Sequence, residues 1–512
     1  MKFMHDYFMG LDNGGSVVKC ALYDTKGNEL CVTSRTPLLN TPKPGYTERD
    51  DKDVWNANIE VIRETISMGE TEYGISKNDI KCVGLTGYGN GICLVDNNGK
   101  TVRPIIVSTD DRGAEMVANY RGNGKEEEVF KYTKQTMWSA MMSSLLTWVH
   151  KYEPEVIQRT SYVLGIKDYV RYHLTGEMKS EYTEASSTGL LNIENATFDP
   201  EIFRLLDMEG MEKLFPKIVM PNEISGYVTL QASNETGLPE GTPIAGGCFD
   251  VDASVLASGI LNDDILCLIA GTWSINEYLI KEWNYGYMEN SNTITKSFLP
   301  EYYLVEESTP TSASNLDWFV KRMLIDEMAD KSIEDVYSEC NEIVESIQPE
   351  ESNVVFIPYL YSSATHTDAK AGFFNLSGYN EKKHLIRAIY EGVVFSSAFH
   401  VEQLMKNGKT FKIARLSGGL TKSEVWTQMM SDVLQMSIEV LQVGEIGAQG
   451  AAMCAAVASG TFSDYKDAVD NMVKVKKVYH PNPDRAQIYE KKYKSFKNAQ
   501  ASIDFFHEKE GE

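Results

Sequence analysis

Apolar and polar residues follow one another along this chain in a pattern that predicts an α/β protein. Short apolar runs end in glycine, asparagine or aspartate, which is typical of buried strands that stop at a turn. Longer stretches carry apolar residues three and four positions apart, the spacing of one helix face. We expect strands over residues 7–12, 17–24, 80–85, 92–96, 105–107, 264–270, 354–360, 413–416 and 439–442. We expect helices over residues 51–68, 135–148, 168–175, 198–214, 251–259, 381–404, 423–434, 447–459 and 486–506, and an extended segment over residues 185–191.

The chain contains two strand–turn–strand units of the same kind. In the first, Asp12 ends a strand, a small-residue turn follows, and the next strand carries Lys19. The turn residues are Asn13, Gly14, Gly15 and Ser16 in the first unit, and Gly271, Thr272, Trp273 and Ser274 in the second. Glycines let backbone N–H groups converge on an anion, and hydroxyl groups add donors, although each turn alone also suits a plain hairpin. The repeated unit predicts two related α/β halves facing each other.

A carboxylate lies at a third predicted strand end. The apolar run from Pro243 ends in two glycines, and Asp250 follows where a helix should begin. In α/β folds, ligand-binding and catalytic residues commonly lie at strand ends of this kind. Asp250 could instead cap the helix, and Asp252 is a second acidic candidate that falls slightly late in the turn.

Composition narrows the classes of function. A chain of 512 residues is too long for one core. The formal net charge of −24 argues against a nucleic-acid partner, although a local basic pocket for an anionic substrate stays possible. The eight cysteines form no C-x-x-C pair, which favours buried free thiols in a reduced compartment. No signal peptide or membrane span is visible, so we expect a cytoplasmic protein with no membrane partner.

Two common nucleotide-binding motifs are absent. Gly-Lys-Thr occurs at residues 99–101 and 408–410, but the glycine that a Walker loop requires five residues earlier is Leu94 or Gln403. No G-x-G-x-x-G follows the first strand, which argues against an NAD-dependent sugar dehydrogenase. What remains is the two hairpin turns together with Ser417-Gly418-Gly419, a strand-to-helix turn.

Four stretches resemble the signatures of a known family, the FGGY carbohydrate kinases of the actin-like (ribonuclease H-like) ATPase fold. They are GLDNGGSVVKCALYD, GGCFD, AGTWS and the long segment that begins LSGGLTKSEVW, and the resemblance covers almost the whole chain. PGYTERD, STDDR, GCFDVDAS and ESTPTSASNLDWF are similar to the L-xylulose / 3-keto-L-gulonate kinase group. The chain departs from D-xylulose kinases at Ser108, Thr109 and Gly89-Asn90, and Leu145 replaces a lysine of the family's first signature. These departures leave the identity of the sugar open.

The resemblance implies a fold and a reaction. The fold is α/β, with two ribonuclease H-like domains and an interdomain cleft: residues 1–253 bind sugar, residues 254–480 bind ATP, and residues 481–512 form a helical tail. The reaction is ATP-dependent phosphorylation of the terminal hydroxyl of a ketose, with Mg²⁺ required and a homodimer expected. The alternatives are another sugar or polyol as substrate (D-xylulose, ribulose, gluconate or glycerol), or an actin-like ATPase that is not a kinase.

The resemblance also implies roles for individual residues. Asp250 is the catalytic base and contacts the sugar, and Asp12 orients hydrated Mg²⁺. The groups expected near the ATP phosphates are Gly14, Gly15, Ser16 and Lys19 from the first half and Gly271 and Thr272 from the second. The groups expected around the adenosine are Gly418, Gly419, Gln428 and Glu445. The sugar-contact candidates are Asn90, Asp110, Arg112 and Trp138, of which Asp110 and Arg112 are also typical of an ion-pair cluster or helix cap.

Overall fold

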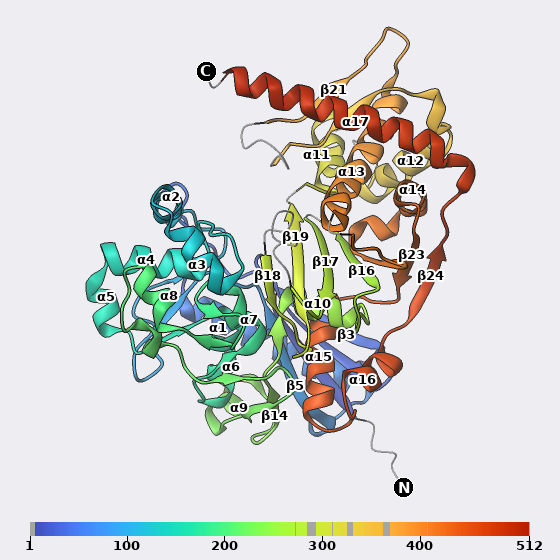
Figure 1. The fold of residues 1–512 in the computed structure, drawn as a ribbon. Coiled ribbons are helices and arrows are strands. Elements are labelled where there is room, and N and C mark those ends of the chain that lie inside the picture. Colours follow the sequence, from blue (N-terminus) through green and yellow to red (C-terminus); the bar gives the residue numbers. More distant parts are fainter. Residues whose placement is uncertain are drawn as a thin grey trace.

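Two seven-stranded sheets form the centre of the molecule in a computed structural model (Figure 1). The structure describes residues 6–271, 273–283, 293–309, 311–324, 331–361, 369–406 and 408–510. The first sheet contains β1 (Tyr7–Asn13), β2 (Val18–Asp24), β3 (Glu29–Arg35), β5 (Ile80–Gly87), β13 (Ile224–Tyr227), β14 (Pro243–Ala245) and β15 (Cys248–Phe249). The second contains β16 (Ile265–Ala270), β17 (Ser274–Ile280), β18 (Thr293–Lys296), β19 (Tyr303–Thr309), β22 (Ile413–Ser417), β23 (Ser437–Leu441) and β24 (Val475–Tyr479).

The two sheets share one strand arrangement. In the first, β1 pairs antiparallel with β2 and parallel with β5. In the second, β16 pairs antiparallel with β17 and parallel with β22. The corresponding hairpin turns therefore lie at corresponding edges of the two sheets, which confirms the two related α/β halves expected from the sequence.

Smaller elements surround these sheets. Five two-stranded ladders join β4 (Glu48–Arg49) with β7 (Ile105–Ile106), β6 (Cys93–Val95) with β8 (Tyr162–Leu164), β9 (Ser180–Glu181) with β12 (Ile218–Val219), β10 (Leu191–Asn192) with β11 (Thr197–Phe198), and β20 (Val355–Ile357) with β21 (Gly372–Phe374). The described 3₁₀ turns are η1 (Lys77–Asp79), η2 (Met211–Leu214), η5 (Pro349–Glu351) and η6 (Gly419–Lys422).

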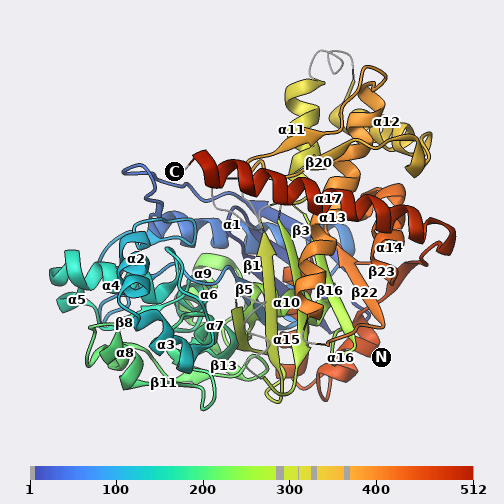
Figure 2. The ribbon, with the colours of Figure 1, turned by 45° about the horizontal axis from the view of Figure 1, so that its top comes forward.

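Helices cover the sheets on both sides. The first half contributes α1 (Asp51–Tyr73), α2 (Ala114–Gly122), α3 (Lys125–Thr133), α4 (Met142–Tyr152), α5 (Pro154–Arg159), α6 (Ile166–Thr175), α7 (Tyr182–Ser187), α8 (Pro200–Leu205), α9 (Leu230–Thr236) and α10 (Asp250–Ala257). The second half contributes α11 (Ser314–Met323), α12 (Ile333–Glu345), α13 (Lys382–Met405), α14 (Glu424–Leu434), α15 (Ile446–Ala458), α16 (Tyr465–Met472) and α17 (Pro483–Glu510). Figure 2 shows α17 crossing the outside of the second half, over α13 and α14. No helix among the described residues is long and apolar enough to cross a membrane.

Two helices, α10 and α15, lie between the sheets and join the halves. Their buried residues share one apolar cluster with Phe8 and Cys82 of the first sheet and with Cys267 and Leu304 of the second. The predicted domain boundary after residue 253 therefore falls inside a helix that packs on both halves. All eight cysteines are buried and unpaired, as the sequence predicts.

Glycines allow α15 to approach its neighbours backbone to backbone. A Cβ on Gly84 of β5 would lie 1.8 Å from the carbonyl oxygen of Ala451, and one on Gly10 of β1 would lie 1.9 Å from that of Ala448. The expectation that the small-residue helix packs closely is confirmed.

Gly84→Ala should therefore destabilise the protein markedly. The new Cβ would clash with backbone atoms of Ala451, which cannot rotate away. The loss of unfolding free energy should therefore reach the upper part of the ~1–3 kcal/mol typical of overpacked cores. Chemical denaturation measures the free energy of unfolding. Gly122→Ala is the matched control, because Gly122 is an exposed residue at the end of α2 and a Cβ there would meet nothing within 4 Å. Equal stability of the two variants would contradict the close approach.

Some expected elements differ from the structure. The helix expected over residues 135–148 begins only at Met142, because Gln135 bridges to Thr293 and its amide donates to the Ser186 and Ile294 carbonyls. The helix expected over residues 198–214 is interrupted, since Asp207 (φ 59°) and Gly210 (φ 84°) adopt left-handed conformations. The segment expected to be extended over residues 185–191 is instead mostly the end of α7 and a turn.

Candidate functional site

Asp12 lies at the end of β1 with one carboxylate oxygen unpartnered. It faces Lys19 across β2 and Thr86 across β5, and its Oδ1 atom is buried without a hydrogen bond. Burial raises the pKa of Asp12 to about 6; nearby Lys19 lowers it and Glu445 raises it. A buried carboxylate oxygen with no protein donor is a suitable ligand for a hard cation such as Mg²⁺.

The turn after Asp12 is open to solvent, and a buried arginine holds its backbone in place. Gly15 and Ser16 are exposed, and a Cβ on Gly15 would meet no atom within 4 Å. Arg49, which is 3% exposed, donates through Nη2 to the Gly15 carbonyl at 2.7 Å. The N–H groups of this turn are therefore reachable by a ligand while its backbone is held in place.

Asp250 is the first residue of α10 and is half-buried. Burial raises the pKa of Asp250 well above its usual value, and the charges of Asp12 and Glu306 raise it further. Phe249 takes the cap position, so the alternative that Asp250 is the helix cap is wrong. Asp252 is fully buried and accepts a hydrogen bond from the Phe298 N–H at 2.9 Å, which assigns it to packing.

Two hydrogen bonds hold the strand end that carries Asp250. Arg171 donates through Nη1 to the Gly246 carbonyl at 2.8 Å. The Phe249 N–H donates to the Thr183 hydroxyl at 2.9 Å, and this hydroxyl donates in turn to Glu181 at 2.8 Å. The backbone is thus fixed at the first of the two glycines and immediately before Asp250.

Behind this strand end lies a buried charge cluster around Lys167. Its Nζ atom lies 2.8 Å from Asp168, 2.9 Å from Glu184 and 3.4 Å from Glu181, and the four side chains are at most 3% exposed. Burial alone would lower the pKa of Lys167, but the surrounding carboxylates raise it. Burial raises the pKa of Glu184 to about 7, although the nearby charge of Lys167 lowers it.

The turn that contains Asn90 packs against Asp250's strand. A Cβ on Gly89 would lie 2.4 Å from the ring of Phe249. Asn90 has a φ of 65°, a conformation that asparagine tolerates, and its Oδ1 accepts from the Met142 N–H at 3.1 Å. The Gly91 N–H of this turn donates to the Ala140 carbonyl at 3.1 Å, and Trp138, two residues before Ala140, is 40% exposed.

Asp110 and Arg112 form a buried ion pair. Asp110 accepts from Arg112 Nε at 2.7 Å, from Arg112 Nη2 and N–H at 2.9 Å each, and from the Thr47 N–H at 2.6 Å. Arg112 also contacts Glu48 at 2.8 Å and lies over the Tyr46 ring. These contacts use the acceptor capacity of Asp110, so the pair braces a loop and leaves Asp110 no acceptor for a sugar hydroxyl.

The second half contains a cavity of about 850 Å³ beside its hairpin turn. Gly271 and Gly419 line it, together with residues of α11–α14. A Cβ on Gly418 (φ 94°) would lie 2.6 Å from the Ala270 carbonyl, so this glycine lets the turn after β22 approach the turn after β16. The aromatic residues of the cavity are Trp273, Tyr337, Tyr361, Tyr390 and Trp426. Thr272 lies outside the described residues.

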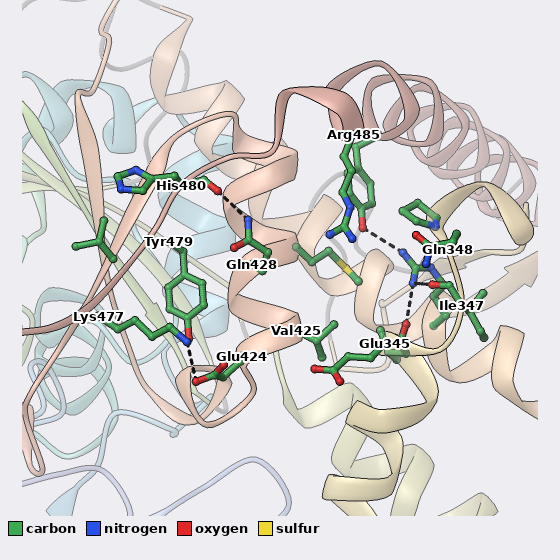
Figure 3. Close-up of a pocket in the computed structure, with 16 residues that line it drawn as sticks. Glu345, Ile347, Gln348, Glu424, Val425, Gln428, Lys477, Tyr479, His480 and Arg485 are labelled. Atoms are coloured by element: carbon green, nitrogen blue, oxygen red, sulfur yellow. Dashed lines mark hydrogen bonds and ion pairs between the residues drawn. The ribbon is translucent and has the colours of Figure 1, made fainter.

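Two of the residues expected near adenosine, Gln428 and Glu445, do not line this cavity. Gln428 donates at 2.8 Å to Asp432 and to the His480 carbonyl, and it lines a separate cavity of about 380 Å³ (Figure 3). Glu445 precedes α15 and forms an ion pair with Lys19 at 2.5 Å, beside Asp12. Neither residue lines the larger cavity, because Gln428 lies on a face of α14 that turns away from it and Glu445 lies beside the Asp12 turn.

Sequence reasoning missed Arg49, Glu306 and the Lys167 cluster. Arg49 lies in the segment PGYTERD, and Glu306 directly precedes ESTPTSASNLDWF, so the family resemblance of these segments could have pointed to both residues. No comparable signal marked the Lys167 cluster, because its charged residues lie in segments of mixed polar and apolar residues.

Two related α/β halves, with small-residue turns at corresponding strand ends and helices between the sheets, define the two-domain actin-like ATPase class. The N-terminal domain of the FGGY family of carbohydrate kinases matches residues 7–257, and the C-terminal domain of the same family matches residues 266–459. The chain belongs to the FGGY family of carbohydrate kinases.

Named relatives and solved structures agree with this assignment. The chain is 33% identical to the "Probable L-xylulose kinase" of Pasteurella multocida, over 97% of this chain and 99% of that protein. It is 32% identical to the "L-xylulose/3-keto-L-gulonate kinase" of Escherichia coli, over 98% of each. The fold matches a xylulose kinase structure from Rhodospirillum rubrum with a TM-score of 0.86 at 25% identity, covering 98% of this chain and 100% of that one.

Proposed function

We propose that this protein transfers the γ-phosphate of ATP to the terminal hydroxyl of a ketose such as L-xylulose or 3-keto-L-gulonate. The observation that carries the proposal is the position of Asp250. Its carboxylate interacts electrostatically with Asp12, while its strand packs against the turn of Asn90. A sugar held by that turn would place its hydroxyl between a proton acceptor and the first hairpin turn. The names of the two relatives support the choice of sugar.

In this proposal Asp250 accepts the proton of the attacking hydroxyl. Phosphoryl transfer needs mainly positioning and charge stabilisation, with proton transfer late in the step. A pKa raised by burial makes the Asp250 carboxylate a better proton acceptor than an exposed one. The N–H groups of Gly14 and Gly15, the hydroxyl of Ser16 and the ammonium of Lys19 would bind phosphate oxygens.

The unpartnered oxygen of Asp12 fits a Mg²⁺ ion. Bound Mg²⁺ would supply positive charge to the phosphate oxygens. The carboxylate of Asp12 would hold it, and Arg49 would keep the neighbouring turn in place.

The nucleoside would occupy the 850 Å³ cavity of the second half. Gly271 would contact phosphates at its mouth, and Gly418 and Gly419 would leave room for the ribose. The exposed sides of Trp273 and Tyr361 suit a planar base, because aromatic faces stack on π-systems.

Asn90 and Trp138 are the sugar contacts that we retain. Because Oδ1 of Asn90 is engaged by Met142, its Nδ2 is the group left to donate to a sugar oxygen. Asp110 and Arg112 would act indirectly, by bracing the loop that follows β7.

A sugar panel tests the proposal. Purified protein with Mg-ATP should release ADP when L-xylulose or 3-keto-L-gulonate is added, and less with D-xylulose, L-ribulose, gluconate or glycerol. ADP release is measured by a coupled assay, and each active sugar is recovered to locate the phosphate. A preference for one of the other sugars or polyols would reassign the substrate within the family. ATP hydrolysis that no sugar stimulates would contradict the kinase proposal and favour an actin-like ATPase.

A further inference from the structure

Asn341 lies where three helices meet at the wall of the 850 Å³ cavity. It belongs to α12 and lines the cavity. Its Oδ1 atom accepts two hydrogen bonds, from the Tyr390 hydroxyl of α13 at 2.9 Å and from the Ser423 hydroxyl before α14 at 2.6 Å.

The surrounding contacts support the placement of the amide oxygen toward the two hydroxyl groups. Ser423 caps α14, and its Oγ accepts from the Trp426 N–H at 3.2 Å, so its hydrogen is available to donate to Asn341. Tyr390 is fully buried and its ring stacks on Trp426 with centroids 4.2 Å apart, which holds its hydroxyl in place. Both acceptor positions of Oδ1 are occupied, so the amide nitrogen is the only polar atom of the Asn341 side chain that can still form a hydrogen bond with a ligand.

That nitrogen is an uncharged donor on a residue that lines the cavity. Asn341 is half-buried, and no hydrogen bond from its Nδ2 is found in the part of the chain that the structure describes. The nearby carboxylate of Asp317 is engaged by the Tyr337 hydroxyl at 2.5 Å and by Lys321 at 2.9 Å. Asn341 therefore has two amide N–H hydrogens with no partner among the described residues, at the wall of a cavity that also includes aromatic rings.

We propose that Asn341 recognises the nucleotide by donating a hydrogen bond to a ring nitrogen of the purine base. This inference rests on the proposed function, which places the nucleoside in this cavity. Purine ring nitrogens are acceptors in the plane of the base, and the aromatic residues around Asn341 suit a planar ligand. Two hydroxyl groups already hold the Asn341 amide in place, so little side-chain entropy is lost when it binds a ligand. The contact would favour a base that has an acceptor at that position.

Asn341→Asp is the variant that separates this role from a structural one. The carboxylate can still accept from Tyr390 and Ser423, so the junction of helices is kept, but the donor becomes an acceptor that repels a ring nitrogen. ADP binding measured by calorimetry should weaken about 10- to 100-fold, since a buried hydrogen bond is replaced by two facing acceptors. Asn498→Asp, which adds the same charge on an exposed turn of α17, should leave ADP binding unchanged.

Analogues that replace one ring nitrogen by C–H identify the contacted atom. Among 1-deaza-, 3-deaza- and 7-deaza-ADP, one should bind the wild type more weakly than ADP does, and the same analogue should bind Asn341→Asp at least as well as ADP does. Equal weakening of all three analogues by the substitution, or unchanged ADP affinity, would overturn the inference. A fall in melting temperature without this analogue pattern would assign Asn341 to structure alone.

The binding experiment needs no sugar, so the two proposals fail in different ways. ADP binding with the expected analogue pattern, but no phosphorylation of any sugar, would overturn the proposed kinase reaction and leave the base contact standing. Sugar phosphorylation with an unaffected Asn341→Asp variant would do the reverse. A wild type that binds no ADP would overturn both.

Discussion

Asp250→Asn should reduce kcat for sugar phosphorylation by about 10²–10⁴-fold, the usual contribution of a positioned general base. Asparagine keeps the size and the hydrogen-bonding shape of the side chain but cannot take the proton. The KM values for ATP and sugar should change far less than kcat, because the substrates keep their other contacts. Steady-state kinetics at saturating concentrations of both substrates measure the effect.

The same substitution should leave the fold intact and raise its thermal stability. Burial and the charges of Asp12 and Glu306 disfavour the ionised form of Asp250. Removing that carboxylate relieves this penalty, a common trade between function and stability at active sites. The melting temperature of the variant should equal or exceed that of the wild type.

Asp252→Asn is the control that decides between the two neighbouring acids. Asp252 is fully buried and accepts from the Phe298 N–H, a bond that the amide oxygen of asparagine can keep, so turnover should stay close to that of the wild type. If Asp252→Asn abolished turnover while Asp250→Asn retained it, the roles of the two residues would be exchanged.

Lys167→Met should cost about 3–5 kcal/mol of unfolding free energy, the range for breaking a buried ion pair from one side. The ammonium group lies within 3.4 Å of Asp168, Glu181 and Glu184, and Met replaces its volume without its charge. Chemical denaturation followed by circular dichroism measures the loss. Lys466→Met is the control: its pair with Asp470 on α16 is exposed, and such pairs contribute about 0–1 kcal/mol.

The loss should grow as the pH rises. Without Lys167, the pKa of Glu184, already raised to about 7, must rise further above its value in the unfolded chain. The folded state then binds more protons than the unfolded state, and stability falls with increasing pH in the range around and above neutrality. A variant as stable as the wild type at pH 8 would show that the cluster does not need its cation.

Local patterns predicted most of the fold. Strand ends at Asp12 and Ala270 follow from apolar runs that stop at small residues, and the repeat of that pattern gave the two related halves. The prediction failed where residues pair with distant partners. Gln135 bonds to Ile294 of the other half, and this contact replaces the helix that local spacing favours.

The candidate site was predictable only in part for the same reason. Asp12 and Asp250 stand at recognisable strand ends, and the structure brings their charges together. Gln428 lies in a signature segment of the sequence, yet its place on the far face of α14 depends on how that helix packs. Asn341 carried no signal at all, because its orientation comes from hydroxyl groups on two other helices.

The sequence by itself determined the α/β class, the duplicated hairpin turns, the acidic strand end and the family resemblance. These are properties of residue order, since periodicity, turn residues and short signatures act over a few positions. Only the tertiary structure decided which polar groups are free to bind a ligand. In it, Arg112 occupies acceptor positions of Asp110, and Asp252 accepts from a backbone N–H. One carboxylate oxygen of Asp12 has no hydrogen-bond partner. A hydrogen bond or an ion pair depends on distance in space, and residues hundreds of positions apart supply those partners.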